Sequence, residues 1–469
     1  MTSGSDIAFA SAEALADLFR KKALSPVEAA EILFARIDAL QPRLNAFCIV
    51  DRDGALASAR ASEQRWRQGT PLSPLDGVPV TIKDLVLMRG FPTLRGSKLI
   101  DPDQDWSEDG PAVARLREAG AVILGKTTTP EFGWKAIGDS PLTGITRNPW
   151  NLDRTTGGSS AGAAAACAAG IAPLHVGSDG AGSIRIPAAF TGIFGIKATF
   201  GRVPAYPASP LGLLSNVGPI TRHVRDAALL LNVLSRPDHR DPYVLAPDDR
   251  DWLDGIEDGL RGVRIAYSPD LGYARVDPEI AAAAAAAARQ FEALGASIEE
   301  VREVFPSPRD ALLTLWAAGE ARVLAGFPVE QRHLCDPGLV AMAALGDRIG
   351  SVEYLGADMA RTALGIRMGE FHQRYDLLLT PMMPVPALPV GQDLTDPALE
   401  EQWLDWSPFS YPFNMTRQPA ASIPCGLTSA GLPIGLQIVG PLYAEDRVLR
   451  AARAFEHTQP ARHPPLFAA

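Results

Sequence analysis

Long apolar runs, clusters of basic residues and paired cysteines are all missing from this sequence of 469 residues. No stretch reaches the ~18 uncharged apolar residues that a membrane-spanning helix needs, and the N-terminus has no basic segment followed by an apolar one. We therefore expect a cytoplasmic protein without a membrane partner. The net charge of −10 disfavours a nucleic-acid partner, because phosphate backbones are bound by clustered lysine and arginine.

Cysteine and histidine are scarce as well. The four cysteines (Cys48, Cys167, Cys335 and Cys425) form no C-x-x-C pair, which favours reduced thiols over a disulfide framework or a zinc site. No two of the seven histidines are four positions apart, and no H-E-x-x-H motif is present. The sequence therefore predicts a protein with no metal and no cofactor.

Helical and strand patterns alternate along the chain. Alternation of this kind favours an α/β fold, and we expect one large domain over residues 1–469, with a central mixed sheet flanked by helices. Predicted helices cover 111–119, 224–234 and most of 305–370, and predicted strands cover 77–83, 121–124, 174–177, 263–267, 375–380 and 434–439.

Two glycine-rich segments match short motifs but lack the structural context that those motifs need. Residues 120–127 fit G-x-x-x-x-G-K-T, yet the residues between the glycines are apolar and favour a strand over a phosphate-binding loop. Residues 158–162 fit G-x-S-x-G around Ser160, but polar, turn-forming residues precede them instead of a strand. His175 lies in an apolar strand pattern that is typical of a core histidine. We therefore interpret neither segment as the site of chemistry.

Lys83 and two serine-containing loops form a third pattern. Ser159 lies 76 positions after Lys83 and 24 positions before Ser183. In order and spacing these three residues resemble the catalytic lysine and serines of the amidase signature family. The resemblance runs from about residue 8 to 456, is densest over 76–225, and implies the amidase signature fold. Further matching segments are 125–127 (GKT), 131–133 (EFG), 147–149 (RNP), 186–188 (IPA) and 431–437 (GLPIGLQ).

The resemblance implies a role for each member of this triad. Ser183 is the expected nucleophile, Ser159 a proton relay on a cis peptide bond, and Lys83 the base. A lysine with its ordinary pKa of about 10.4 is charged at neutral pH and accepts no proton. Burial disfavours the ammonium form and lowers the pKa. The apolar residues before Lys83 predict such burial.

The resemblance also implies an oxyanion hole and its support. The expected donors are the backbone N–H groups of Gly180, Ala181, Gly182 and Ser183, and the expected supporting residues are Gly158, Ser160, Asp179 and Arg185. Asp179 and Arg185 are expected to form an ion pair. Ala181 stands where the family usually has glycine, so a positive φ there would be strained, and its Cβ would narrow the acyl pocket.

The expected substrate is a small amide. Ile186 stands where the amidase subunits of glutamyl-tRNA amidotransferases usually carry glutamine, which favours a hydrophobic or aryl amide and adds carbamates as a further candidate. Substrate-pocket segments are expected within 305–420, where an aromatic cluster fits either the core or the pocket. Members of the family often form homodimers, so a homodimer is expected too. The cluster consists of Trp403, Trp406, Phe409, Tyr411 and Phe413.

Three other functions stay open. The chain could be the amidase subunit of a glutamyl-tRNA amidotransferase, or an inactive scaffold on the same fold, which a fluorophosphonate probe would not label. The match at 120–127 keeps a nucleotide-binding protein as the last alternative, and a thermal shift with ATP and Mg²⁺ tests it.

Overall fold

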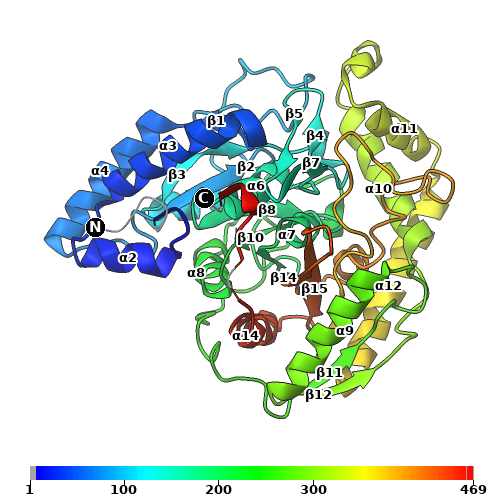
Figure 1. The fold of residues 1–469 in the computed structure, drawn as a ribbon. Helices are drawn as coiled ribbons and strands as arrows, with labels where there is room; N and C mark the ends of the chain where they lie inside the picture. The colour runs from blue at the N-terminus through cyan, green and yellow to red at the C-terminus, as the bar shows by residue number, and fades with distance from the viewer. Residues whose placement is uncertain (1–6, 461, 468–469) are drawn as a thin grey trace.

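The computed structural model describes residues 7–460 and 462–467 as an α/β structure around one large sheet (Figure 1). The sheet has 11 strands in the order β1-β3-β2-β8-β10-β9-β14-β15-β13-β11-β12, which confirms the predicted α/β class. Its strands are β1 (Phe47–Val50), β2 (Pro79–Lys83), β3 (Val122–Thr127), β8 (Leu174–Asp179), β9 (Phe194–Lys197), β10 (Asn216–Thr221), β11 (Arg264–Tyr267), β12 (Ser297–Glu300), β13 (Leu377–Pro381), β14 (Ala420–Leu427) and β15 (Pro433–Val439).

The sheet is mixed, and its parallel part positions the residues of interest. Strand β2 lies between β3 and β8 and is parallel to both, so the carboxyl ends of the three strands share one edge. Strand β11 is parallel to β12 and β13, and the other neighbours are antiparallel. Two small hairpins lie outside the sheet: β4 (Asp139–Ser140) with β5 (Gly144–Ile145), and β6 (Arg147–Asn148) with β7 (Asn151–Thr155).

Helices cover both faces of the sheet. Figure 1 shows α2, α3 and α4 beyond the β1 end and α10, α11 and α12 on the opposite side of the molecule. In the described part of the chain no helix has the length and the apolar composition needed to cross a bilayer. The helices are α2 (Ala12–Arg20), α3 (Pro26–Leu44), α4 (Arg52–Gln68), α5 (Pro111–Glu118), α6 (Ala161–Ala168), α7 (Arg185–Thr191), α8 (Val224–Leu234), α9 (Pro278–Ala293), α10 (Arg309–Leu324), α11 (Pro337–Gly346), α12 (Ser351–Arg374), α13 (Pro412–Met415) and α14 (Glu445–Glu456), with short 3-10 turns at Glu131–Gly133, Gly212–Leu214, Val329–Leu334 and Pro465–Phe467.

The core is divided between the two faces because strand side chains alternate. On β8, Leu174 and Val176 join the large core that includes α8, α9 and α14. Gly177 faces the other way, where an added Cβ would lie 2.9 Å from Ser160 Oγ and 3.1 Å from Ile184 Cγ1. Helices α6 and α7 therefore approach the sheet closely on this second face, and the loops before them lie above β8.

Several strands differ from the sequence prediction. Strand β3 continues from the predicted 121–124 to Thr127, and β8 continues from the predicted 174–177 to Asp179. Strands β9, β10 and β14 were not predicted, because they contain glycine, proline and small residues in place of a clear apolar alternation. Close packing explains two of these glycines: a Cβ at Gly195 would lie 2.8 Å from Ile184 Cγ2, and one at Gly218 would lie 2.7 Å from Ile196 O.

Candidate active site

Lys83 is the last residue of β2, and three serine hydroxyls surround its ammonium nitrogen. Lys83 Nζ donates to Ser159 Oγ at 2.7 Å, to Ser178 Oγ at 2.9 Å and to Ser160 Oγ at 3.1 Å. Parallel pairing of β2 with β8 brings Lys83 beside Ser178, and the loop before α6 supplies the other two serines. Within residues 7–460 and 462–467, Lys83 thus has hydroxyl partners and no carboxylate in direct contact.

Burial controls the charge of Lys83. The side chain is fully buried, and loss of hydration lowers its pKa well below the usual value. The negative charge of Asp179 opposes this shift, but Asp179 is itself paired with Arg185. Burial therefore favours the neutral amine form of Lys83 over the ammonium form.

The loop that carries Ser159 has no room for larger residues. The peptide bond between Gly158 and Ser159 is cis. A Cβ on Gly158 would lie 2.7 Å from Ile137 O, and one on Gly157, whose φ is +72°, would lie 2.9 Å from Phe190 Cδ2. Glycine is therefore required at both positions, and the loop presents Ser159 to Lys83.

Ser160 joins the two serine loops. Its amide donates to the carbonyl oxygen of Ser183 at 3.1 Å. Its hydroxyl donates to the carbonyl oxygen of Ser178 at 3.1 Å and accepts from the Ser178 amide at 3.2 Å. Ser160 thus holds the loop before α6 against the end of β8 and against Ser183, which is 6% exposed.

Asp179 and Arg185 form the ion pair that was expected. Arg185 Nε donates to Asp179 Oδ2 at 2.9 Å, and Arg185 Nη2 donates to Oδ1 at 3.0 Å. Both side chains are fully buried, and the Arg185 charge helps to hold the pKa of Asp179 below its usual value although burial alone would raise it. A bidentate pair across the loop fixes the backbone between its two ends.

The backbone amides and φ angles of that loop differ from residue to residue. The Gly182 amide, expected to face an oxyanion, donates to Asp179 Oδ1 at 2.7 Å. Among the described residues, the amides of Gly180, Ala181 and Ser183 have no protein acceptor. Positive φ falls on Gly182 at +124° and not on Ala181, so alanine adds no backbone strain.

Residues from the last quarter of the chain complete the support, and no role at the site was predicted for them, although Gln437 ends the matching segment 431–437. Asn414 Nδ2 donates to Asp179 Oδ1 at 2.9 Å, and Asn414 Oδ1 accepts from Arg185 Nη2 at 2.6 Å. Gln437 Oε1 accepts from Arg185 Nη1 at 2.7 Å, and Ser410 Oγ donates to the Ala181 carbonyl at 2.6 Å. Ser178 was also missed, although pairing between β2 and β8 could have indicated it.

The rejected motifs have structural roles. Lys126 lies on β3, where its Nζ is 2.8 Å from Asp84 Oδ1, 2.6 Å from Thr93 Oγ1 and 2.9 Å from the Pro92 carbonyl. His175 is buried on β8 at 2.7 Å from Thr81 Oγ1, and burial lowers its pKa to about 3. Neither residue is placed to bind a phosphate or to activate Ser160.

The aromatic cluster belongs to the core. All five rings are buried in the core of the second face, with Trp403 against Trp316 and Trp406 stacked on Phe190. The cluster therefore braces the loop that carries Ser410.

A cavity of about 120 Å³ lies beside the site, and its lining includes none of Lys83, Ser159 and Ser183. Ser178, Phe132, Leu211 and Glu320 are among its lining residues, and Ser178 is bonded to Lys83. A larger cavity of about 280 Å³ lies beside the C-terminal segment, and none of the residues lining it belongs to the site.

The chain is similar to known proteins over most of its length. The model of the Amidase family matches residues 28–449. The chain is 39% identical to an acylamidase of Rhodococcus erythropolis, over 93% of each chain. It is 35% identical to a glutamyl-tRNA(Gln) amidotransferase subunit of Geobacter metallireducens, over 95% of this chain and 98% of that protein. A crystal structure of a bacterial aryl acylamidase superposes with a TM-score of 0.90 at 33% identity, covering 97% of both chains.

A family match over most of the chain, with relatives of this identity, defines an enzyme class. The protein belongs to the amidase signature family and is an amidohydrolase.

Proposed function

We propose that the protein hydrolyses the C–N bond of a hydrophobic or aryl amide through an acyl-enzyme on Ser183, with Ser159 as relay and Lys83 as base. One observation carries this proposal: Lys83 is fully buried, no carboxylate of the described residues contacts it, and its Nζ lies 2.7 Å from Ser159 Oγ. A neutral amine beside a hydroxyl is the arrangement that activates a serine in the absence of histidine.

The proposed steps conserve every proton. Ser183 Oγ attacks the carbonyl carbon while its proton passes to Ser159, and the Ser159 proton passes to Lys83. The amides of Gly180, Ala181 and Ser183 stabilise the resulting oxyanion. Lys83 then returns the proton through Ser159 to the leaving nitrogen, and the C–N bond breaks. A water molecule then attacks the ester while its proton passes through Ser159 to Lys83. The bond to Ser183 Oγ breaks, the same proton returns to Ser183 Oγ through Ser159, and the acid is released.

The proposed substrate class rests on the residues around the site and on the relatives. Ile186 is buried and lies close to Gly182, where an added Cβ would be 2.7 Å from Ile186 Cδ1. An apolar side chain at this position supports a hydrophobic substrate in preference to the polar substrate glutamine. Similarity to an acylamidase and to an aryl acylamidase supports the same choice, and aryl carbamates are a further group to test.

The test is turnover of a panel of para-nitroanilides and aryl carbamates, with Ser183→Ala as the matched control. We expect release of the aryl amine by the wild type and none above background by the variant. Full activity in Ser183→Ala would overturn the nucleophile. Turnover of aryl carbamates but no aryl amide would overturn the amide class.

The similarity to subunits of glutamyl-tRNA(Gln) amidotransferases supplies a second candidate function, the release of ammonia from glutamine. Its test is ammonia release from glutamine by the same preparation. Release of ammonia together with inert anilides would favour this second function. Anilide turnover without ammonia release would leave the acylamidase function standing.

A further inference from the structure

A second buried ionisable group lies near the triad and has no role in the proposed hydrolysis. Glu320 on α10 is 1% exposed. Within the described residues its carboxyl group forms neither a hydrogen bond nor an ion pair, and Oε2 is buried without a partner. Burying an unpaired carboxyl group is unfavourable, so its retention at this position calls for a partner.

The position of Glu320 connects it with the catalytic loop. Glu320 lines the same cavity as Ser178 and Leu211. One turn earlier on α10, Trp316 lies against the loop, since a Cβ on Gly180 would be 3.3 Å from Trp316 Cζ3. Residues four apart share one face of a helix, so the face of α10 that carries Glu320 is the face turned toward this loop.

No other acidic group among the described lining residues competes for a cation in this cavity. Arg95 and Tyr206 are the other titratable residues that line it. Burial is the sole cause that raises the pKa of Glu320 to about 8, so the Arg95 charge does not compensate this carboxyl group. Proline, leucine, valine and phenylalanine dominate the rest of the lining. The cavity thus combines apolar walls with one unpaired acid.

Building on the proposed amide hydrolysis, we propose that Glu320 binds a primary amine of the substrate, so that the enzyme selects amides whose apolar chain ends in an amino group. The apolar lining would cover the methylene chain. The ammonium group would donate to the Glu320 carboxylate, whose Oε1 is the oxygen not fully enclosed by protein. A substrate with a chain of the same length that ends in a methyl group would leave the Glu320 carboxyl group unpaired, and the hydrogen bond to the ammonium group would be lost.

Direct binding tests this selectivity without any need for turnover. Calorimetry with Ser183→Ala protein would compare n-alkylamines with the n-alkanols of the same length. A charge-assisted hydrogen bond predicts a Kd about tenfold lower for the amine. Glu320→Gln should remove this preference and leave alkanol binding unchanged. Equal binding of amine and alkanol, or a preference that survives in Glu320→Gln, would overturn the proposal.

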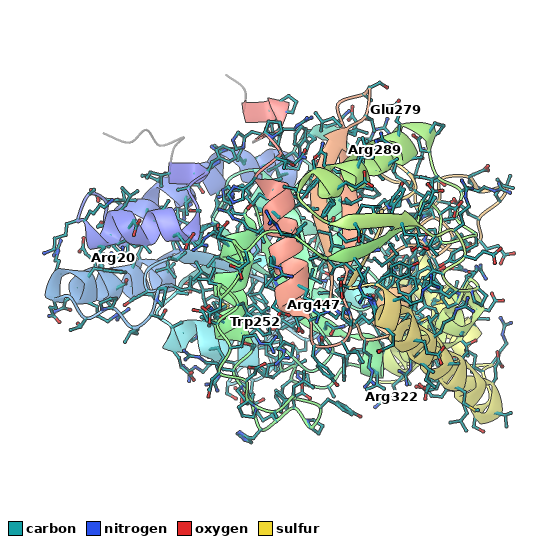
Figure 2. All side chains as sticks on the ribbon, turned by 90° about the horizontal axis from the view of Figure 1, so that it is seen from below. Arg20, Trp252, Glu279, Arg289, Arg322 and Arg447 are labelled. Atoms are coloured by element: carbon teal, nitrogen blue, oxygen red, sulfur yellow. The ribbon has the colours of Figure 1, made fainter. Side chains whose placement is uncertain are left out.

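Steady-state kinetics then tests whether the same preference for an amino group appears in catalysis. The wild type should cleave para-nitroanilides of ω-amino acids with a kcat/KM about tenfold above the alkanoyl anilides of equal length, and Glu320→Gln should cleave both equally. Arg322→Gln is the matched control, because Arg322 lies two residues further along α10, is exposed and is labelled in Figure 2. Absence of turnover on every anilide would count against the proposed hydrolysis, whereas the calorimetry would still decide the amine site.

Discussion

Two lysines on neighbouring strands have opposite surroundings. Lys83 ends β2 and Lys126 lies on β3, directly beside it in the sheet, and both side chains are buried. Lys126 contacts the carboxylate of Asp84 at 2.8 Å, whereas the hydrogen-bond partners of Lys83 are serine hydroxyls. Burial lowers the pKa of both lysines, and a carboxylate opposes the shift in each case: Asp84 in direct contact with Lys126, and Asp179 without a hydrogen bond to Lys83.

The difference lies in the groups that contact each ammonium nitrogen, and under the proposed mechanism it separates the base Lys83 from the structural Lys126. A carboxylate in contact stabilises the ammonium form and keeps the proton on the lysine. Hydroxyl groups accept hydrogen bonds but bring no negative charge, so they align the nitrogen without making it a permanent cation. We therefore expect the two lysines to respond in opposite ways to the same substitution.

Lys83→Met should produce the largest effect on activity. Loss of a general base costs about 10²–10⁴-fold, so kcat/KM on an anilide should fall by at least that range. Stability should not fall in parallel, because the substitution removes an amine whose burial is unfavourable. Steady-state kinetics and thermal unfolding of the same preparation measure both quantities. Residual activity within tenfold of wild type would show that Lys83 is not the base.

Lys126→Met is the matched counterpart and should act on stability. It leaves the buried Asp84 carboxylate without its cation, which costs about 3–5 kcal/mol of unfolding free energy. Activity of the folded fraction should stay within a few-fold of wild type. Denaturant unfolding measures the loss, and adding Asp84→Asn to the variant should restore part of it. A stable Lys126→Met protein that has lost activity would contradict the division between the two lysines.

The sequence was sufficient to predict the strand that ends at Lys83, because β2 is a short apolar segment with a clear boundary. The two serines were indicated by the resemblance to the amidase signature family and not by any local structural pattern. The sequence did not reveal the contacts of Asn414 and Gln437 with Asp179 and Arg185, which join residues more than 200 positions apart. Such contacts depend on how the strands are ordered in the sheet, and no local pattern records that order.

The other differences between prediction and structure concern residues whose local sequence fits more than one environment. Gly182 was expected to donate to an oxyanion, but the adjacent carboxylate of Asp179 takes its amide. The aromatic cluster fitted either a pocket or a core, and burial of all five rings places it in the core. In both cases the deciding factor is a tertiary neighbour that the local sequence does not specify.

The pH dependence of kcat/KM should also separate the two lysines. Lys83 must be neutral to accept a proton, so activity should rise about tenfold per pH unit below its lowered pKa and become constant above it. The plateau should begin below pH 10, since an unperturbed lysine titrates at about 10.4. Lys126→Met should leave this profile in place. A profile that rises only near the ordinary lysine pKa would mean that burial does not tune Lys83.

Ser178→Ala should give the smallest effect, because it removes one of the three hydroxyls around Lys83 and leaves the relay in place. A single hydrogen bond contributes about 1 kcal/mol, so kcat/KM should fall about fivefold. The loss should appear in kcat more than in KM if the hydroxyl orients the lysine and does not bind the substrate. Ser178→Thr keeps a hydroxyl and should recover most of the rate. A fall as large as that of Lys83→Met would instead assign Ser178 to the proton path itself.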